Sequence, residues 1–250
     1  MDADIRNERS IEQALASAYG AVNAVSLYVE HGRDTFHAVH VEAAQRLAAV
    51  ARRAAVERLV HISGIGSDAT SPSLYIRKRG EGENAVRNSF ADVVVVRPAV
   101  MFGPDDAFLT TILGLVRRLP VYPMFGDGLT RLQPAYVDDV AAAVATLMQA
   151  PAGGPSVFEC AGPRIYTYRQ LLEVVAREAG ATPMLLPVPF AMWHALAWCA
   201  EMLHSPPITR NQIELMQVDT VRSPGMPGFD ELGLEPRSVE EVLATMVNKR

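Results

Sequence analysis

Short runs of β-branched and other apolar residues alternate with longer segments of helical periodicity over much of the chain. The runs predicted as strands are Ala21–Val29, Arg58–Ser63, Val93–Arg97, Gln133–Val137 and Val157–Ala161. The segments predicted as helices are Ala43–Val56, Tyr75–Asn88, Phe108–Leu119 and Val140–Gln149, the last with Asp139 as its N-cap. This alternation predicts an α/β fold, in which a parallel sheet is covered by helices on both faces.

The pattern changes near Pro151, after which the chain is mostly helical and less regular. Thr167 with Gln170, and Ser238 with Glu241, have the spacing of capping boxes at helix N-termini. The sequence therefore predicts two domains, residues 1–150 with the parallel sheet and residues 151–250 as a small, mostly helical lobe.

One segment of this lobe, Phe190–Leu203, is apolar almost all round and contains both tryptophans, Trp193 and Trp198. Helices that are hydrophobic on every face usually lie in a core, so packing of this helix onto the sheet is the favoured interpretation. The segment is too short to span a bilayer. Two alternatives stay open: the helix lies at a membrane interface, or it contacts a hydrophobic partner.

The charge and the rarer residues exclude several classes of function. A formal net charge of −5 leaves no basic stripe that would bind nucleic acid. The two cysteines, Cys160 and Cys199, are far apart, and the six histidines show no metal-ligand spacing, so we predict neither a disulfide nor a metal site. The polar first residues do not resemble a signal peptide, and no apolar run has the length of a membrane span. These features predict a cytoplasmic location.

Candidate chemistry begins at Ser63, which ends a predicted strand and is followed by a polar loop and by Tyr75 at the start of a helix. Here the chain resembles the extended and atypical short-chain dehydrogenases, where a serine after a strand and a Tyr-x-x-x-Lys helix form a proton-relay site. Hydride transfer to a carbonyl creates an oxyanion. The resemblance implies that Tyr75 donates a proton, that Ser63 holds the oxygen, and that a nearby cation lowers the pKa of the phenol.

The cation departs from the family motif, because residues 75–79 read Tyr-Ile-Arg-Lys-Arg and place Arg79 where lysine is expected. A guanidinium can lower the pKa of Tyr75, but its planar fork cannot simply replace an ammonium at ribose hydroxyls. Lys78, on a neighbouring face of the helix, is a partial substitute. The alternative interpretation is that Tyr75 only opens the helix and that the adjacent cations are solvated surface charge.

The resemblance also implies contacts with a dinucleotide, NADP or NAD. The residues at positions that contact the cofactor in such proteins are Asp4, Asn23, Ala24, Val25, Tyr75, Pro98 and Val100. Asp4 corresponds to a position near the adenine, and backbone groups of Pro98 and Val100 correspond to positions at the nicotinamide carboxamide. The residue that distinguishes NAD from NADP follows the family's second strand and is not part of this sequence.

Four further segments narrow the resemblance. They are Ser-Gly-Ile-Gly-Ser at 63–67, Ser-Pro at 71–72, Phe-Gly-Asp-Gly at 125–128 and Pro-Ile-Thr-Arg-Asn-Gln at 207–212. With these segments the chain resembles bacterial relatives of the nucleotide-binding accessory subunit of respiratory complex I, alpha subcomplex subunit 9. The resemblance implies a Rossmann-type doubly wound sheet, NADP(H) held as a structural element without turnover, and an association with complex I or with the inner face of the cytoplasmic membrane.

Members of this family begin with a strand, a glycine-rich turn and a helix whose N-terminal amides hold the pyrophosphate. The resemblance implies that this chain is truncated and lacks that first βαβ portion, so we expect impaired or absent cofactor binding and an exposed apolar edge at Ala21–Val29. Two other functions stay open. One is an NAD(P)H-dependent reductase or epimerase that uses Tyr75 as proton donor, and the other is a nonfunctional truncated remnant.

Overall fold

The chain was analysed as a computed structural model, which describes residues 3–104, 106–151, 153–203, 206 and 208–248. It forms two compact units that are each built from several stretches of chain. The first unit comprises Met1–Pro98, Ala142–Glu159 and Pro224–Leu232, and the second comprises Ala99–Ala141, Cys160–Ser223 and Gly233–Arg250. These units interleave along the sequence, whereas the division into residues 1–150 and 151–250 stays a prediction.

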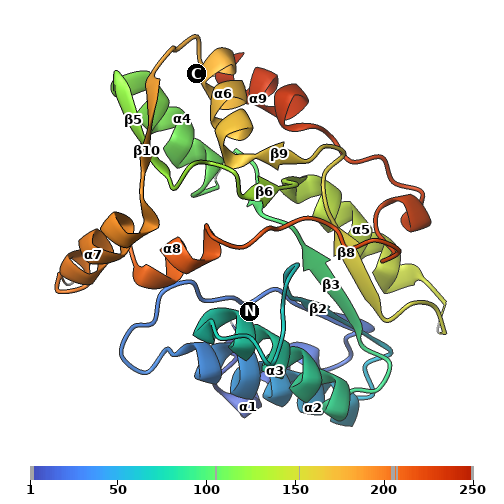
Figure 1. The fold of residues 1–250 in the computed structure, drawn as a ribbon. Coiled ribbons are helices and arrows are strands. Elements are labelled where there is room, and N and C mark those ends of the chain that lie inside the picture. Colours follow the sequence, from blue (N-terminus) through green and yellow to red (C-terminus); the bar gives the residue numbers. More distant parts are fainter. Residues whose placement is uncertain (1–2, 105, 152, 204–205, 207, 249–250) are drawn as a thin grey trace. The chain divides into compact units, whose positions relative to one another are not determined.

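The first unit contains a four-stranded sheet in the order β1-β2-β3-β8 (Figure 1). Its strands are β1 (Gly20–Asn23), β2 (Arg58–Ile62), β3 (Val94–Pro98) and β8 (Val157–Cys160). β1 pairs with β2, and β2 with β3, in parallel, with Gly20 opposite Arg58 and Val60 opposite Val94. The predicted α/β class with a parallel sheet is confirmed, and β1 occupies one edge of the sheet.

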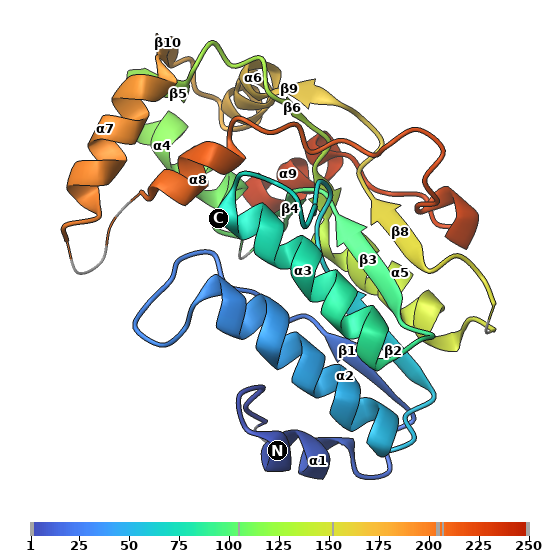
Figure 2. The same ribbon diagram turned by 60° about the horizontal axis from the view of Figure 1, so that its bottom comes forward.

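Helices cover the sheet of the first unit. They are α1 (Glu8–Leu15), the π-helix η1 (His37–Ala43), α2 (Ala44–Arg53) and α3 (Leu74–Ser89), with the short 3-10 helix η2 (Asp230–Leu232). In Figure 2, α1, α2 and α3 lie in front of the strands, and α5 (Val137–Gln149) lies behind them. Small residues of α2, such as Ala44, Ala48 and Ala51, are fully buried, so this helix packs closely on the core.

The second unit is a mixture of helices and short strand pairs. Its helices are α4 (Leu109–Arg118), α6 (Tyr168–Glu178), α7 (Phe190–Ala200), α8 (Arg210–Leu215) and α9 (Val239–Asn248). Its strand pairs are β5 (Val121–Phe125) with β10 (Met184–Val188), β4 (Met101–Phe102) with β7 (Ala135–Tyr136), and β6 (Arg131–Leu132) with β9 (Tyr166–Thr167). Leu171, Leu172 and Leu243 are fully buried in its core.

Two strands differ from their predictions for local reasons. β1 ends at Asn23 rather than Val29, because the Asn23 side chain turns the backbone by accepting a hydrogen bond from the amide of Val25 over 3.3 Å. Of the predicted strand Gln133–Val137 only Ala135–Tyr136 forms a strand, β7, and β6 ends before the predicted range, at Leu132. Gln133 lies between them and donates its side-chain amide to the carbonyl of Gly162 over 2.7 Å.

Helix ends were predicted with mixed success. The capping boxes of Thr167 with Gln170 and of Ser238 with Glu241 are both present. Asp139, predicted as an N-cap, is wrong in that role, because α5 begins at Val137 and includes Asp139 in its first turn.

The prediction that Phe190–Leu203 is a buried helix is also wrong. In α7 only Ala197 is buried, and several large apolar side chains of the helix are exposed. These residues are Met192, Leu196 and Trp198, and Met202 and Leu203, which follow the end of α7, are exposed as well. Composition alone could not reveal this exposure. No helix in the described ranges combines the length and the apolar character that crossing a membrane requires.

Candidate functional site

Tyr75 lies at the start of α3 in the first unit, with its ring enclosed by other side chains. Only 3% of the residue is exposed. The ring of Tyr28 stacks on it with centroids 5.7 Å apart, and the rings of Phe36 and His40 meet it edge-on at 5.3 and 5.5 Å. The sequence did not identify these three neighbours, which reach the phenol from the loop after β1 and from the start of η1.

Arg79 lies one helical turn after Tyr75 and brings its guanidinium to the phenol. Nη1 donates a hydrogen bond to the Tyr75 hydroxyl over 2.7 Å, and Cζ lies 5.4 Å from the ring centroid. Burial raises the pKa of Tyr75, and the charge of Arg79 only partly opposes this, so the pKa stays above its usual value. The expected pairing of Tyr75 with Arg79 is present, but the expected lowering of the pKa of the phenol is not.

Ser63 directly follows β2 and is 2% exposed. Its Oγ lies 2.9 Å from Oγ of Ser67 and also hydrogen bonds to the carboxylate of Glu83. Within the described ranges no hydrogen bond joins Ser63 to Tyr75. The structure therefore directs Ser63 toward Glu83 and not toward the phenol.

Glu83 is a buried carboxylate that links α3 to the sheet, with 2% of its surface exposed. Nε and Nη2 of Arg97 donate to it over 2.9 and 2.8 Å, and Nη1 of Arg87 does so over 3.3 Å. Burial acts to raise the pKa of Glu83, but the hydrogen bonds from Arg97 and Ser63 and the two guanidinium charges hold it below its usual value. Glu83 is therefore ionised at neutral pH, and it was not identified from the sequence.

Lys78 points to a different partner. Its Nζ lies 2.6 Å from a carboxylate oxygen of Glu81 in an ion pair along α3. The part of the chain that the structure describes contains no contact between Lys78 and the phenol of Tyr75. A role for Lys78 as a partial substitute for the family lysine gains no support from this geometry.

Two buried histidines, His40 and His61, lie near the carboxyl ends of β1 and β2. Nδ1 of His61 lies 3.1 Å from Nδ2 of Asn23, and Nε2 of His40 lies 3.0 Å from the carbonyl oxygen of Leu27. Burial lowers the pKa of each histidine to about 4, and the charge of Arg79 contributes to both shifts. Both rings are therefore neutral at pH 7. Asn23 is itself buried and holds the end of β1 against β2.

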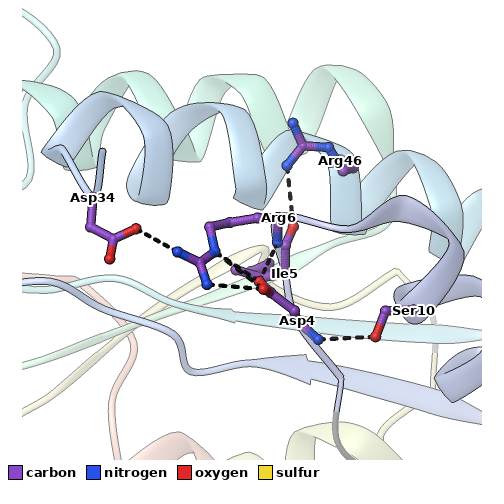
Figure 3. A network of polar contacts seen from close by, with 6 residues as sticks. All are labelled: Asp4, Ile5, Arg6, Ser10, Asp34 and Arg46. Atoms are coloured by element: carbon purple, nitrogen blue, oxygen red, sulfur yellow. Dashed lines mark hydrogen bonds and ion pairs between the residues drawn. The ribbon is translucent and has the colours of Figure 1, made fainter. Parts of the chain in front are cut away.

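Asp4 takes part in a surface network of the first unit (Figure 3). Nε and Nη2 of Arg6 donate to its carboxylate over 3.0 and 2.9 Å, while Nη1 of Arg6 reaches Asp34 at 2.9 Å. The hydrogen bonds from Arg6 lower the pKa of Asp4. Ser10 accepts a hydrogen bond from the amide of Asp4. Asp4, which was predicted to lie near the adenine of a cofactor, thus accepts hydrogen bonds from Arg6. Because Arg6 also pairs with Asp34, it links Asp4 to the loop after β1.

The remaining cofactor candidates are backbone or surface positions. Ala24 and Val25 follow β1 and are exposed. Pro98 ends β3 in the first unit, and its carbonyl accepts the amide of Ile65 over 3.0 Å. Val100 belongs to the second unit, and its carbonyl accepts the amide of Ala135 over 3.0 Å. Asn23, Ser63 and Pro98 thus mark the carboxyl ends of three neighbouring strands, which is where open α/β sheets bind ligands.

Comparison with known proteins places this geometry in a family. Residues 11–197 match the model of the RmlD substrate binding domain. The chain belongs to the RmlD substrate binding domain family. It is 30% identical to the mitochondrial NADH dehydrogenase [ubiquinone] 1 alpha subcomplex subunit 9 of Arabidopsis thaliana, over 96% of this chain and 62% of that protein. The chain therefore spans less than two thirds of that relative.

Two other matches show how broad the relationship is. A ceramide reductase of Caulobacter vibrioides is 27% identical, over 74% of this chain and 58% of its own. The crystal structure of dTDP-4-dehydrorhamnose reductase from Bacillus anthracis in complex with NADP has a TM-score of 0.71 at 15% identity, over 99% of this chain and 86% of its own. The resemblance to short-chain dehydrogenases and to alpha subcomplex subunit 9 is confirmed, together with the Rossmann-like fold.

The RmlD-family chain has a second polar cluster, in its second unit. Asp139 accepts hydrogen bonds from the backbone and the guanidinium of Arg237 at 2.6 to 2.9 Å. Cζ of Arg237 lies 4.2 Å from the ring centroid of Tyr136. Asp139 thus anchors the segment before α9, a role that its sequence neighbours could not reveal because Arg237 lies far along the chain.

The motifs that narrowed the resemblance have mixed structural roles in this RmlD-family member. In segment 207–212, Thr209 and Gln212 form a capping box at the start of α8, while Pro207 lies outside the described residues.

No group of three or more potential metal ligands is found in the described ranges. Cys160 is buried and Cys199 is exposed.

Proposed function

We propose that this chain belongs to a protein that holds NADP(H) or NAD(H) as a structural element and acts as an accessory or assembly component of respiratory complex I. The observation that carries this proposal is the burial of Tyr75 among Tyr28, Phe36 and His40. The relationship to alpha subcomplex subunit 9 supports the partner, since that relative is named as a subunit of NADH dehydrogenase.

The chemistry of a proton relay explains why the environment of Tyr75 supports a structurally bound cofactor over catalytic turnover of that cofactor. A tyrosine that donates a proton to a substrate must reach that substrate, and a lowered pKa makes the transfer efficient near neutral pH. Here Tyr28, Phe36 and His40 surround the ring, and the pKa of the phenol is raised by burial. Both properties oppose catalysis by Tyr75.

The residues at the carboxyl ends of the strands fit one half of a dinucleotide better than the other. The exposed backbone after Asn23 offers polar groups to a nicotinamide and its ribose. A bound dinucleotide would supply hydride chemistry there. In the described ranges no strand leads through a glycine-rich turn directly into a helix, so we propose that these 250 residues alone hold the pyrophosphate weakly.

The exposed surface of α7 supports docking to a hydrophobic partner. Met192, Leu196 and Trp198 are each more than half exposed on a helix without charged residues. Apolar patches of this kind mark contacts with proteins or membranes. We propose that α7 contacts a membrane-arm subunit of complex I or the adjoining membrane surface, with the protein on the cytoplasmic side.

The proposal is tested by measuring NADPH binding and NADPH oxidation on the same preparation, with and without aldehyde and ketone substrates. We expect weak binding without oxidation, in the unmodified chain and in Tyr75→Phe alike. In cells, a tagged chain should co-purify with complex I subunits. Substrate-dependent oxidation of NADPH that disappears in Tyr75→Phe would contradict the proposal.

A second candidate is an NAD(P)H-dependent reductase or epimerase that uses Tyr75. One contact favours it, the hydrogen bond from Arg79 to the Tyr75 hydroxyl, because it places a permanent cation at the proton donor. The relationship to the ceramide reductase points the same way. The oxidation assay with Tyr75→Phe distinguishes the two functions.

A further inference from the structure

Arg79 differs from the other cations of its helix in lacking an anionic or carbonyl acceptor. Arg77 donates to the carbonyls of Ser71 and Pro72, Lys78 pairs with Glu81, and Arg87 pairs with Glu83. The only hydrogen bond that Arg79 makes with the described residues is the one to the neutral Tyr75 hydroxyl. A guanidinium has five N–H donors, so most of the donors of Arg79 have no acceptor in the part of the chain that the structure describes.

The surroundings do not neutralise this charge. Arg79 is half-buried, and the groups that its charge acts on include the phenol of Tyr75 and the rings of His40 and His61. All of these are neutral at pH 7. The nearest buried carboxylate, Glu83, is already shared by Arg97 and Arg87. A charge that is partly removed from water without a counterion is costly, so the site favours an anion from outside the chain.

Gly64 gives the guanidinium its position. A Cβ atom built on Gly64 would lie 3.0 Å from Nη1, 3.1 Å from Cζ and 3.2 Å from Nη2 of Arg79. The planar group therefore lies flat against the backbone just after β2. This is the carboxyl end of a parallel strand, the usual location of ligands in open α/β sheets.

We propose that Arg79 and the backbone at Gly64 form a binding site for an oxyanion, a carboxylate or a phosphate group of a small ligand. The fork of the guanidinium matches two oxygens of such a group, which the ammonium of a lysine cannot do. This proposal stands independently of dinucleotide binding. It assigns to Arg79 a ligand of its own, separate from any effect on the Tyr75 proton.

The test is isothermal titration calorimetry of the whole chain with three probes in chloride-free buffer: inorganic phosphate, malonate and NADPH. We expect phosphate or malonate to bind, and Arg79→Gln to weaken that binding by about tenfold or more, as expected for loss of a charge-assisted pair. Arg79→Lys should weaken it less. Arg52→Gln, which removes an exposed arginine of α2, is the matched control and should leave the affinity unchanged.

Gly64→Ala supplies an independent variant that keeps the charge. Its Cβ should displace the guanidinium and weaken anion binding, and this effect should vanish in the Arg79→Gln background because the two residues act together. Absence of binding by both phosphate and malonate, or equal binding by Arg79→Gln and the unmodified chain, would overturn the proposal. Failure of NADPH alone to bind would count against the proposed function and leave this site intact.

Discussion

Opposing influences meet at the Tyr75 hydroxyl. Burial among Tyr28, Phe36 and His40 raises the pKa of the phenol, and the neighbouring Arg79 opposes the shift without reversing it. The same guanidinium lowers the pKa of both buried histidines. Arg79 is thus a cation among side chains that are neutral at pH 7. Burial keeps the Tyr75 phenol protonated, and burial together with the charge of Arg79 keeps both imidazoles neutral.

His40 gives a test of this environment through the pH dependence of stability. Its pKa is 6.5 in the unfolded chain and about 4 in the fold, so the unfolded state binds the proton first as the pH falls. The contribution is therefore complete above pH 6.5 and is lost progressively toward pH 4, up to about 3 kcal/mol. His40→Gln retains a donor for the Leu27 carbonyl and cannot titrate.

Urea unfolding at a series of pH values measures this effect. In the unmodified chain the free energy of unfolding should fall between pH 6.5 and 4 with a slope that includes His40 and His61. The slope should decrease by about one proton in His40→Gln. An unchanged slope would mean that His40 titrates normally in the fold and that the enclosure around Tyr75 is open to solvent.

The sequence predicted part of this site and missed the rest for a physical reason. Tyr75 and Arg79 are four residues apart on a helix, so their contact follows from helical spacing. Tyr28 and His40 come from a loop and a π-helix about 40 residues earlier, and no local periodicity connects them to Tyr75. Glu83 was missed because its partner Arg97 follows on the next strand.

At the scale of elements, α3 packs against η1 through a glycine. A Cβ atom on Gly82 would lie 2.0 Å from the carbonyl oxygen of His40, so only glycine permits this approach. We expect Gly82→Ala to destabilise the fold by about 2–3 kcal/mol, because the two helices must move apart. Gly114, within α4, has no atom near its Cβ position, and Gly114→Ala should stabilise by about 0.5–1 kcal/mol.

Chemical denaturation followed by circular dichroism compares these two glycine variants with the unmodified chain. Opposite signs are expected, since both substitutions raise the helix propensity and only one meets a steric obstacle. A neutral or stabilising Gly82→Ala would show that α3 and η1 are less closely packed than the structure indicates.

The two tryptophans of α7 have different surroundings on the same helix. Nε1 of Trp193 donates to the carbonyl of Met124 over 3.3 Å, and the centroids of the Trp193 and Phe125 rings lie 4.4 Å apart. Trp198, in contrast, is 59% exposed. We expect Trp193→Ala to destabilise the protein by about 2 kcal/mol and Trp198→Ala to change stability by less than about 0.5 kcal/mol.

Acrylamide quenching of each single-tryptophan variant provides a direct readout of this difference. The fluorescence of Trp198, measured in Trp193→Phe, should be quenched much more strongly than that of Trp193, measured in Trp198→Phe. Equally weak quenching of both tryptophans would restore the interpretation of α7 as a buried helix, which its uniformly apolar composition had favoured.

For the whole molecule, the alternation of strand-like and helical segments predicted the α/β class, but it did not predict how the chain passes between the two units. The strand β3 could be predicted from the run of valines at 93–96, because buried parallel strands need no alternation. The interleaving of the units depends on contacts far apart in sequence, such as that of Asp139 with Arg237. Local patterns carry no signal for such contacts.

The edge of the sheet allows a prediction about self-association. Among the described strands β1 pairs with β2 alone, and Val22 within it is 42% exposed, so an apolar side chain accompanies backbone groups that no described strand pairs. Edge strands of this kind pair with other chains, and a lysine on the edge prevents it. We expect Val22→Lys to reduce concentration-dependent association in sedimentation velocity. Leu129→Lys, at an exposed residue outside the sheet, is the control and should have little effect.

The change in net charge cannot explain a decrease in association. The chain carries a formal charge of −5, and either lysine brings it one unit nearer to zero, which weakens the repulsion between molecules. A decrease in association by Val22→Lys alone must therefore come from the strand edge. Equal sedimentation of Val22→Lys and the unmodified chain would mean that β1 does not mediate association, and an equal decrease in both variants would assign it to exposed apolar surface in general.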